Sequence, residues 1–230
     1  MNQRQKTYVI ISAYNESTVV RSVLEKVLAK FEHVICVDDG SRDATAIEIA
    51  KTKALIVRHC INMGAGAGIQ TGVDFALQDP EAAYFILFDA DGQHSVEDAT
   101  RMLQRLKTDD LDIVIGSRFL GKEAKAMPTV KRFLLKAAAW FSYITSGVRL
   151  SDSHVGLRVF NRRFAEKLQL TMPDFAHASE LVHRIVEHQF AFAEEPVTIT
   201  YTDYSRRKGQ PVINAINIAF DVLLNKVTKK

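Results

Sequence analysis

Short apolar runs alternate with stretches of helical periodicity through the first half of the chain. The apolar runs predict strands at 8–13, 33–37, 55–57, 84–88 and 111–116. Between them, apolar residues recur at three- and four-residue spacing, which predicts helices at 19–28, 41–51, 64–77 and 96–106, the second with Ser41 as its N-cap. This order predicts an α/β fold with a doubly wound, mostly parallel sheet flanked by helices.

The second half of the chain has longer helical stretches and fewer apolar runs. It predicts a helix at 129–146, a strand at 157–160, a helix at 176–188 and a strand at 197–201. A last helix is expected at 211–227, and its narrow polar stripe consists of Asn214, Asn217, Asp221 and Asn225. No linker-like segment or internal repeat divides the chain, so residues 1–230 are expected to form a single domain.

Composition narrows the class of protein. The formal net charge of +3 is too small to argue for nucleic-acid binding, and no nucleic-acid partner is expected. The N-terminus lacks the apolar region of a signal peptide, and no stretch approaches the ~20 apolar residues of a membrane-spanning helix. Cys36 and Cys60 lie at or just after predicted strands and are expected to be buried thiols in a reducing compartment. A cytoplasmic location follows as the expectation.

Two carboxylates, Asp89 and Asp91, follow the fourth predicted strand. Side chains at i and i+2 of an extended chain point the same way, so these two can converge on one point. Two hard oxygen donors suit Mg²⁺ or Mn²⁺, and Gln93 could add a neutral oxygen. The alternative is a polar turn after a buried strand, because Asp and Gly are common turn residues.

Polar clusters also follow the first two predicted strands. Asp38 and Asp39 come directly after the second strand, and Tyr14, Asn15 and Glu16 come after the first. The carboxyl ends of parallel strands share one edge of the sheet, where α/β proteins bind ligands. The three clusters therefore predict a ligand site at that edge, with turn formation as the alternative role of Asp39.

These motifs, in this order and spacing, resemble glycosyltransferase family 2. The resemblance is carried by residues 13–16, 37–41, 89–91 and 116–118. Asp89 to His94, with the pattern Asp-x-Asp-x-Gln-His, is similar to the family's dolichyl- and polyprenyl-phosphate sugar synthases, and the similarity continues at 151–156 and 206–209. It implies the GT-A fold and inverting transfer of a hexosyl group from a nucleotide diphosphate sugar.

The resemblance also implies a division of the chain and roles on the donor side. Residues 1–118 would form the nucleotide-sugar-binding half, 119–210 the acceptor half and 211–230 the C-terminal amphipathic helix. The residues expected to bind the nucleotide are Ala13, Tyr14, Glu16, Asp38, Asp39, Gly64, Asp89 and Ala90. The expected metal ligands are Asp89, Asp91 and Gln93. At Gly64 the alternative to close backbone approach is tight packing of the following helix on the sheet.

On the acceptor side the resemblance implies three further roles. Arg118 would lie near the sugar or the acceptor phosphate, and Arg206 would reach the leaving diphosphate, where guanidinium offers bidentate donors. Asp152 is the candidate base if the acceptor is a hydroxyl, with a turn or helix cap as its alternative role. The expected catalytic residues are Asp91, Arg118, Asp152 and Arg206.

Basic residues cluster beside the long helix expected at 129–146. From Arg118 to Lys136 there are six basic residues and one acid, Glu123. Basic residues next to an apolar helix suit a membrane surface and a lipid phosphate, which Arg118, Arg132 or Lys136 could hold. The alternative is that this helix and the C-terminal helix are buried against the domain or a partner.

The expected function is therefore a metal-dependent, inverting glycosyltransferase that uses a UDP- or GDP-sugar and a polyprenyl-phosphate acceptor. It is expected to act peripherally at the cytoplasmic face of the membrane, on the membrane surface itself or with a small membrane-protein partner. One alternative is transfer to a saccharide or lipid-linked saccharide in cell-wall or surface polysaccharide synthesis, with Asp152 as base. Another is a nucleotide-binding subunit without catalytic activity.

Overall fold

The computed structural model describes residues 5–120, 148, 150–152, 155–171 and 177–200. These residues build one seven-stranded sheet in the order β3-β2-β1-β4-β6-β5-β7. The strands are β1 (Lys6–Ala13), β2 (His33–Asp38), β3 (Leu55–Arg58), β4 (Ala82–Leu87), β5 (Ile113–Ser117), β6 (Arg158–Asn161) and β7 (Phe192–Pro196). Within this sheet β6 runs antiparallel to both of its neighbours, β4 and β5, and the other pairings are parallel.

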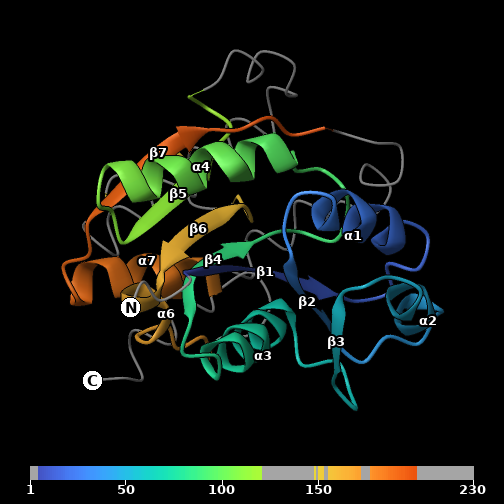
Figure 1. Ribbon diagram of the computed structural model, residues 1–230. Coiled ribbons are helices and arrows are strands. Elements are labelled where there is room, and N and C mark those ends of the chain that lie inside the picture. Colours follow the sequence, from blue (N-terminus) through green and yellow to red (C-terminus); the bar gives the residue numbers. More distant parts are fainter. Residues whose placement is uncertain (1–4, 121–147, 149, 153–154, 172–176, 201–230) are drawn as a thin grey trace, which may run out of the picture.

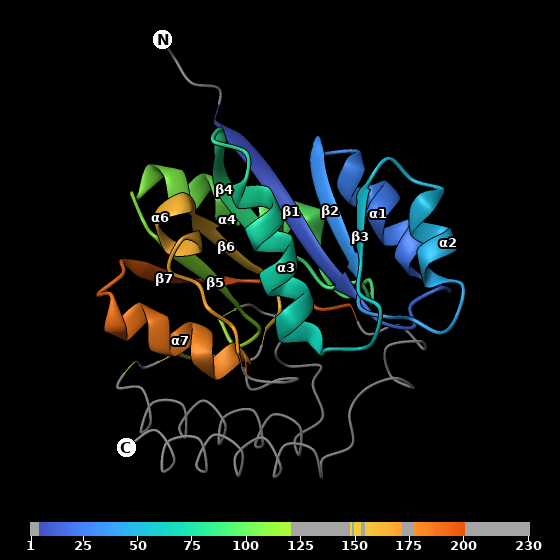
Figure 2. The same ribbon diagram turned by 90° about the horizontal axis from the view of Figure 1, so that it is seen from below.

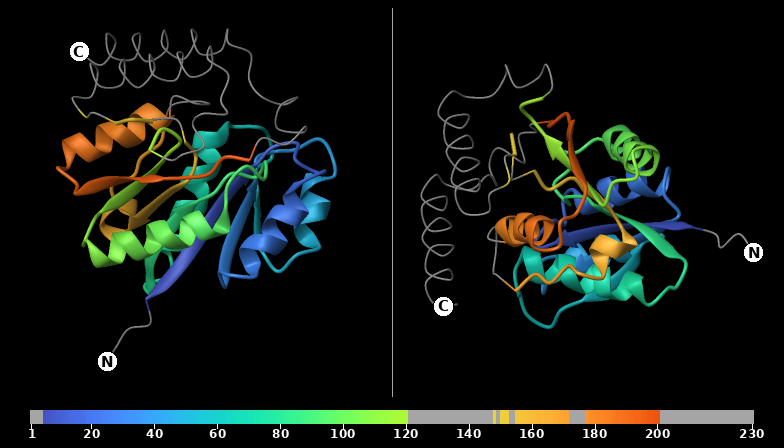
Figure 3. Two further views of the ribbon diagram at one scale, coloured as in Figure 1. Left: turned by 90° about the horizontal axis from the view of Figure 1, so that it is seen from above. Right: turned by 90° about the vertical axis from the view of Figure 1, so that its left-hand side faces the viewer.

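Helices cover both faces of the sheet (Figures 1, 2 and 3). One face carries α1 (Val20–Leu28), α2 (Thr45–Ala50) and α4 (Val96–Thr108), whose apolar residues join the first of two buried clusters. The other face carries α3 (Ala65–Leu77), α6 (Arg162–Ala165) and α7 (His177–Glu187), which contribute to or lie over the second cluster. The central strands are thus buried from both sides, as their apolar runs predicted, whereas the edge strands β3 and β7 are partly exposed. The α/β fold class is confirmed.

Local signals explain where these helices begin and which side they bury. In α1 the buried residues Val20, Val23, Leu24 and Val27 recur at helical spacing and form one apolar face. At the start of α4 the Ser95 hydroxyl caps the helix by accepting from the backbone N–H groups of Glu97 and Asp98. Both acids of that first turn also interact favourably with the helix dipole.

The glycines inside α3 allow close packing on the sheet. A Cβ on Gly68 would lie 2.2 Å from Ser12 Oγ, and one on Gly72 would lie 2.4 Å from Ile10 Cγ2, both in β1. A side chain at either position would therefore have to push the helix off the strand. Tight packing on the sheet therefore accounts for these two glycines of α3.

Two expectations about secondary structure are wrong. Residues 197–200 form no strand beyond a bridge at Ile199; the strand is Phe192–Pro196, which is rich in acids. Its acids are stabilised by partners that the local pattern does not reveal, because Glu194 accepts from Ser151 and Glu195 pairs with Arg101. Ser41 is also not the N-cap of α2, which begins at Thr45.

One further expectation fails, and several lie outside the described residues. Cys36 is buried, but Cys60 is exposed because it lies in the loop after β3 rather than in a strand. The expected helices at 129–146 and 211–227, together with Arg132, Lys136 and Arg206, lie outside the described residues. In the part of the chain that the structure describes, no helix is both long and apolar enough to span a bilayer. The division into donor and acceptor halves stays a prediction.

Candidate functional site

The ends of four strands bring the predicted site residues to one edge of the sheet. Because β1, β2, β4 and β5 point the same way, the polar segments that follow them lie along the same edge (Figure 3). The reversed strand β6 begins at this edge, so Arg158, its first residue, lies between the ends of β4 and β5. This placement agrees with the edge expected from the sequence.

The Asp39 carboxylate is saturated by donors of the protein itself. Its Oδ1 accepts from His59 Nδ1 at 2.7 Å and from the Met63 backbone N–H at 2.9 Å. Its Oδ2 accepts from Asn62 Nδ2 at 2.9 Å and from the Gly64 backbone N–H at 2.8 Å. Asp39 is 1% exposed and fixes the loop before α3, including Gly64, whose φ is +93°. In this structure it is an architectural carboxylate.

Asp38 is equally buried and has a different partner. Its Oδ1 accepts from the Ser41 backbone N–H at 3.0 Å, and its Oδ2 lies 2.9 Å from Arg58 Nε at the end of β3. The Arg58 side chain is 58% exposed. The exposed group beside Asp38 is therefore Arg58, a residue that the sequence analysis did not identify.

The loop after β1 is joined to the loop after β2 by hydrogen bonds. The Asn15 N–H donates to Ser41 Oγ at 2.9 Å, and Asn15 Oδ1 accepts from the Arg42 N–H at 2.9 Å. The Glu16 N–H donates to Thr45 Oγ1 at 2.8 Å. These bonds hold the two loops together as one rigid wall of the candidate site.

Of the residues expected to line a nucleoside pocket in this wall, Ala13 and Glu16 are buried. Tyr14 is 37% exposed. Their roles toward a nucleotide stay a prediction.

Asp89 follows β4 and lies against two other segments. Its Oδ2 accepts from His94 Nε2 at 2.8 Å, so that ring nitrogen carries a proton. The Asp89 side chain is 49% exposed, whereas the His94 side chain is 3% exposed. A Cβ on Gly156 would lie 2.2 Å from both carboxylate oxygens of Asp89, so only glycine leaves room for them.

Asp91 is held by Gln93, which stands two residues further on. The Gln93 backbone N–H donates to Asp91 Oδ1 at 3.0 Å, and Gln93 Nε2 donates to Oδ2 at 2.7 Å. Ala90 between the two acids is buried in the core. Gln93 thus orients Asp91, and its amide oxygen is the atom left for the ligand role expected of it.

The loop that carries these acids is anchored to the end of the described chain. The Thr200 N–H donates to the Gln93 carbonyl at 3.0 Å, and His94 forms an antiparallel bridge with Ile199. The segment that leads toward Arg206 therefore starts beside the Asp89–Asp91 pair.

The two acids have opposite electrostatic surroundings. For Asp89, desolvation opposes ionisation, but His94, Arg158 and His177 outweigh it and lower the pKa of the carboxyl group. For Asp91, desolvation and then the charge of Asp89 raise the pKa. The pair is therefore short of positive charge on the Asp91 side.

A bound divalent cation would supply the positive charge that is missing beside Asp91. In the described part of the chain, no group of three or more His, Cys, Asp or Glu residues is placed to hold a metal ion. Two adjacent carboxylates and an amide oxygen instead match Mg²⁺ or Mn²⁺, which take many ligands from phosphates and water. Asp89, Asp91 and Gln93 are the residues that would hold such an ion.

Arg118, just after β5, forms a two-pronged ion pair with Asp152. Arg118 Nε donates to Asp152 Oδ2 at 2.6 Å, and its Nη2 donates to Oδ1 at 2.8 Å. Asp152 is 1% exposed, and its backbone N–H donates to Glu194 of β7 at 3.2 Å. The Ser151 N–H also donates to Glu194, at 2.9 Å. Asp152 is thus fixed from two sides and orients the Arg118 guanidinium.

Arg158 is the residue of this edge that the sequence analysis missed most clearly. It is 2% exposed, and burial lowers the pKa of its guanidinium to about 10, while the charges of Asp89 and Asp152 raise it. The sequence feature that could have identified it is the single charged residue, Arg158 itself, inside the apolar run Leu157–Phe160. His59 and Gly156 were also missed as supports, because their partners, Asp39 and Asp89, are distant in the sequence. His94 was missed although its partner, Asp89, is only five residues away.

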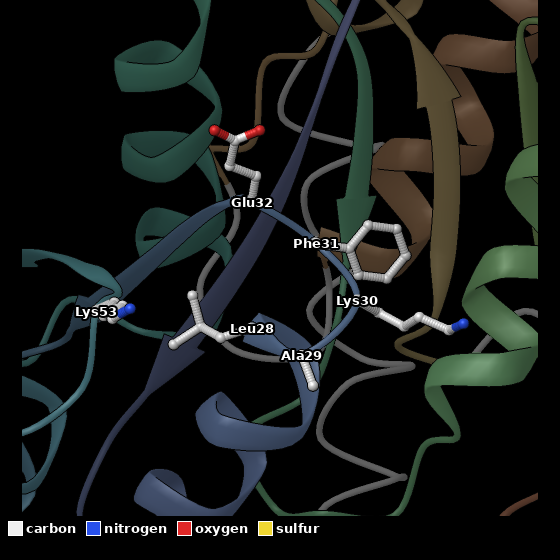
Figure 4. Close-up of a pocket in the computed structure, with 6 residues that line it drawn as sticks. All are labelled: Leu28, Ala29, Lys30, Phe31, Glu32 and Lys53. Carbon is white, nitrogen blue, oxygen red and sulfur yellow. The ribbon is translucent and has the colours of Figure 1, made fainter.

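A shallow hollow of about 380 Å³ lies away from these carboxylates (Figure 4). Its lining comes from the segment before β2 and from Lys53 before β3, at the opposite edge of the sheet: Leu28, Ala29, Lys30, Phe31, Glu32 and Lys53. It brings none of the predicted site residues together, and it carries no functional assignment.

Comparison with known proteins gives a consistent result. A family model described as glycosyl transferase family 2 matches residues 8–169. The UDP-N-acetylglucosamine–dolichyl-phosphate N-acetylglucosaminyltransferase of Methanococcus voltae is 29% identical over 244 residues, with 96% of each chain covered. The polyprenol monophosphomannose synthase of Mycolicibacterium smegmatis is 30% identical over 210 residues, which cover 85% of this chain and 78% of that protein.

Solved structures share the fold at lower identity. Glucosyl-3-phosphoglycerate synthase from Mycobacterium tuberculosis, solved with Mn²⁺ and uridine-diphosphate-glucose, superposes with a TM-score of 0.72 at 15% identity. The match covers 97% of this chain and 78% of that one. The likeness shows that the sheet and its helices have the GT-A arrangement, as expected from the sequence.

Proposed function

The chain belongs to glycosyl transferase family 2, and on that premise we propose that it transfers a sugar, with inversion, from a nucleotide diphosphate sugar to a polyprenyl phosphate. Glycosyltransferase activity follows from the family. The acceptor, the stereochemistry and the need for a metal are the proposal.

Two relatives support the choice of acceptor. The Methanococcus voltae protein is named for dolichyl phosphate, and the Mycolicibacterium smegmatis protein is named for a polyprenol. Both matches cover more than three quarters of each chain, so the similarity includes the acceptor half as well as the donor half. A lipid acceptor would also bring the protein to a membrane surface, and we propose peripheral action at the cytoplasmic face.

The observation that carries the proposal is the placement of two oppositely charged groups at one sheet edge. Asp89 and Asp91 follow β4, and Arg118, oriented by Asp152, follows β5. In this arrangement the acids would bind the donor through a metal ion, and the guanidinium would attract an anionic acceptor.

Metal dependence is supported by the donor set and by the shortage of positive charge beside Asp91. The solved neighbour was determined with Mn²⁺ and a nucleotide sugar on the same fold. When bound, a divalent ion supplies positive charge that stabilises the departing diphosphate. Asp89 and Asp91 would position the ion, and Gln93 would keep Asp91 oriented.

The pairing of Asp152 supports a phosphate rather than a hydroxyl acceptor. Both carboxylate oxygens of Asp152 accept from Arg118, and the carboxylate is buried. Taking a proton from a hydroxyl would disrupt a buried two-pronged ion pair, which is costly. A phosphate is already anionic near neutral pH, so its attack on the anomeric carbon needs no base.

The test is a transfer assay with the full chain. Labelled UDP-N-acetylglucosamine, UDP-glucose and GDP-mannose are each offered with polyprenyl phosphate in detergent micelles or with free saccharides. We expect a labelled lipid product with one donor, dependent on Mn²⁺ or Mg²⁺ and lost in EDTA. The anomeric configuration of the product, read by NMR, should be opposite to that of the donor.

Other outcomes would overturn parts of this proposal. Transfer to saccharides in preference to the lipid phosphate would favour the alternative acceptor. Full activity in EDTA would remove the metal from the mechanism. Donor binding without transfer or hydrolysis in any of these mixtures would favour a nucleotide-binding subunit.

A further inference from the structure

Arg158 is a fully buried arginine in the middle of the candidate site. It is the first residue of β6 and pairs in register with Leu87 of β4 and Ile115 of β5. Asp89 follows Leu87 by two residues, and Arg118 follows Ile115 by three. A strand residue thus stands between the two loops that carry the donor-side and acceptor-side charges.

A buried guanidinium needs negative partners, because an unpaired charge away from water is strongly unfavourable. Among the described residues, the charges of Asp89 and Asp152 both raise the pKa of the Arg158 guanidinium, which places these two carboxylates near it. One belongs to the proposed metal site, and the other binds Arg118.

Gly156 explains how Asp89 comes so near to this strand. The Asp89 carboxylate fills the space where a side chain of residue 156 would begin. Arg158 pairs in register with Leu87, so both side chains project to the same face of the sheet. Asp89 follows Leu87 by two residues, and the Phe88 N–H continues the ladder by donating to the Ile10 carbonyl, so the Asp89 side chain starts from that same face.

The result is a row of alternating charge across the site. His94 donates to Asp89 at one end, and Arg118 donates to Asp152 at the other. Arg158, whose backbone lies between the ends of β4 and β5, is the cation between these two ion pairs.

We propose that Arg158 is a positioning residue for the transfer proposed above: its buried guanidinium holds the carboxylates of Asp89 and Asp152 in place and so ties the metal side of the site to the acceptor side. This inference rests on the proposed function. It assigns no contact between Arg158 and either substrate.

The first test measures ligand binding in variants of Arg158. Arg158→Met removes the charge at similar volume, and we expect it to weaken Mn²⁺-dependent binding of UDP or GDP by about 10- to 100-fold, as losses of supporting groups around metal sites do. The same variant should lower kcat with polyprenyl phosphate. Arg158→Lys keeps the charge and should recover part of both losses.

Arg162 provides a matched control at the other end of β6. It donates to the backbone carbonyls of Leu77, Asp79 and Ala82 and pairs with Glu166, so these contacts join α6 to its neighbours. Arg162→Gln should lower the melting temperature without changing nucleotide affinity. Equal binding losses in Arg158→Met and Arg162→Gln would overturn the inference, since both would then reflect general loosening.

The second test needs no substrate. If Arg158 balances the charge of Asp89, Asp89→Asn should lower the melting temperature less in the Arg158→Met background than in the wild type, or should raise it. If Arg158→Met alone gives no cooperative transition, the double variant should recover one. Additive shifts, or a double variant that stays unfolded, would overturn the inference.

These results separate the inference from the proposed function. A wild-type protein that does not act on polyprenyl phosphate refutes the proposed function, while the melting experiment still tests the pairing. Additive shifts in a protein that does transfer sugar refute the role of Arg158 alone.

Discussion

Two pairs of aspartates stand at the same edge of the sheet and differ in almost every physical respect. Asp38 and Asp39 are buried, and Asp39 accepts four hydrogen bonds from the protein. Asp89 is about half exposed, and its charge helps to raise the pKa of Asp91. Both pairs follow buried parallel strands, and in the sequence they look alike.

The number of hydrogen-bond donors around each carboxylate separates structural carboxylates from those suited to bind a ligand in this fold. Where backbone N–H groups of a neighbouring loop saturate an acid, its negative charge is already balanced and the acid holds the loop. Where two neighbouring carboxylates have few hydrogen-bond donors, the repulsion between their charges is unfavourable until a cation binds. Asp39 holds the wall of the site, and Asp89 with Asp91 is suited to bind a cation.

Neutralising Asp91 is expected to have the largest effect at this edge. Asp91→Asn should reduce turnover by about 100-fold or more, because a positioned charge that stabilises the leaving group is lost. The melting temperature should stay the same or rise, since the repulsion from Asp89 disappears. Turnover with Mn²⁺ and calorimetric titration of Mn²⁺ with nucleoside diphosphate measure both effects.

The control for this prediction is Asp110→Asn, the same change at an exposed turn residue. It should leave turnover and metal binding unchanged. An Asp91→Asn protein that still binds Mn²⁺ with wild-type affinity would show that this carboxylate is not a metal ligand.

Asp39 should respond in the opposite manner. In Asp39→Asn the new amide N–H₂ faces donors, so we expect the free energy of unfolding to fall by about 2–3 kcal/mol. The loss of turnover in the folded protein should be much smaller than for Asp91→Asn. Urea denaturation and turnover are compared with Asp74→Asn, an exposed acid of α3.

Equal stability of the Asp39→Asn and Asp74→Asn proteins would contradict the structural role of Asp39. A turnover loss as large as that of Asp91→Asn, at unchanged stability, would instead place Asp39 in direct contact with substrate.

The wall that Asp39 builds also depends on the packing of α3. Gly68→Ala puts a methyl group 2.2 Å from Ser12 Oγ, so helix and strand must separate slightly. We expect a loss of about 1–2 kcal/mol in the free energy of unfolding, typical of overpacking. Ser12→Gly in the same protein removes the obstructing atom and should restore part of the loss; no restoration would locate the strain elsewhere.

The smallest expected effect concerns an acid at the opposite edge. The Lys6 ammonium, the Glu81 backbone N–H and the Tyr8 hydroxyl lower the pKa of Asp79 to about 2. Because the folded-state pKa is lowered, this stabilisation is present above about pH 4 and is lost as pH falls toward 2.

Asp79→Asn should therefore make the decrease in melting temperature between pH 4 and 2 slightly less steep. The groups are near the surface, so added salt should reduce the difference between wild type and variant. An identical pH dependence in both proteins would contradict the lowered pKa.

Much of the fold could be predicted because its signals are local. The strands at β1, β2, β3, β4, β5 and β6 were expected within about two residues of their observed bounds. Strand β7 was not, because Phe192–Pro196 carries two acids whose stability comes from Ser151 and from Arg101 and Arg105 of α4. Partners so distant in the sequence cannot be recognised from the residue pattern within and around the strand.

The site residues show the same contrast between local signals and partners that are distant in the sequence. Asp89, Asp91 and Arg118 could be found because strand ends and short motifs mark them. The family resemblance is confirmed by the match over residues 8–169. The roles of Arg158, Gly156 and His59 depend on which distant carboxylate lies beside each of them, and only the three-dimensional structure reveals that. The individual assignments of ligand and catalytic roles stay predictions.

The pairing of β6 with both of its neighbours makes this edge sensitive to strand register. Arg158 lies opposite Leu87 and Ile115, and these two residues belong to the same buried cluster as Phe160, two residues further along β6. Sliding β6 by one residue against β4 and β5 would turn the guanidinium toward the opposite helical layer. A one-residue slip in this pairing would therefore be more damaging than many substitutions, although it leaves every charged group of the chain in place.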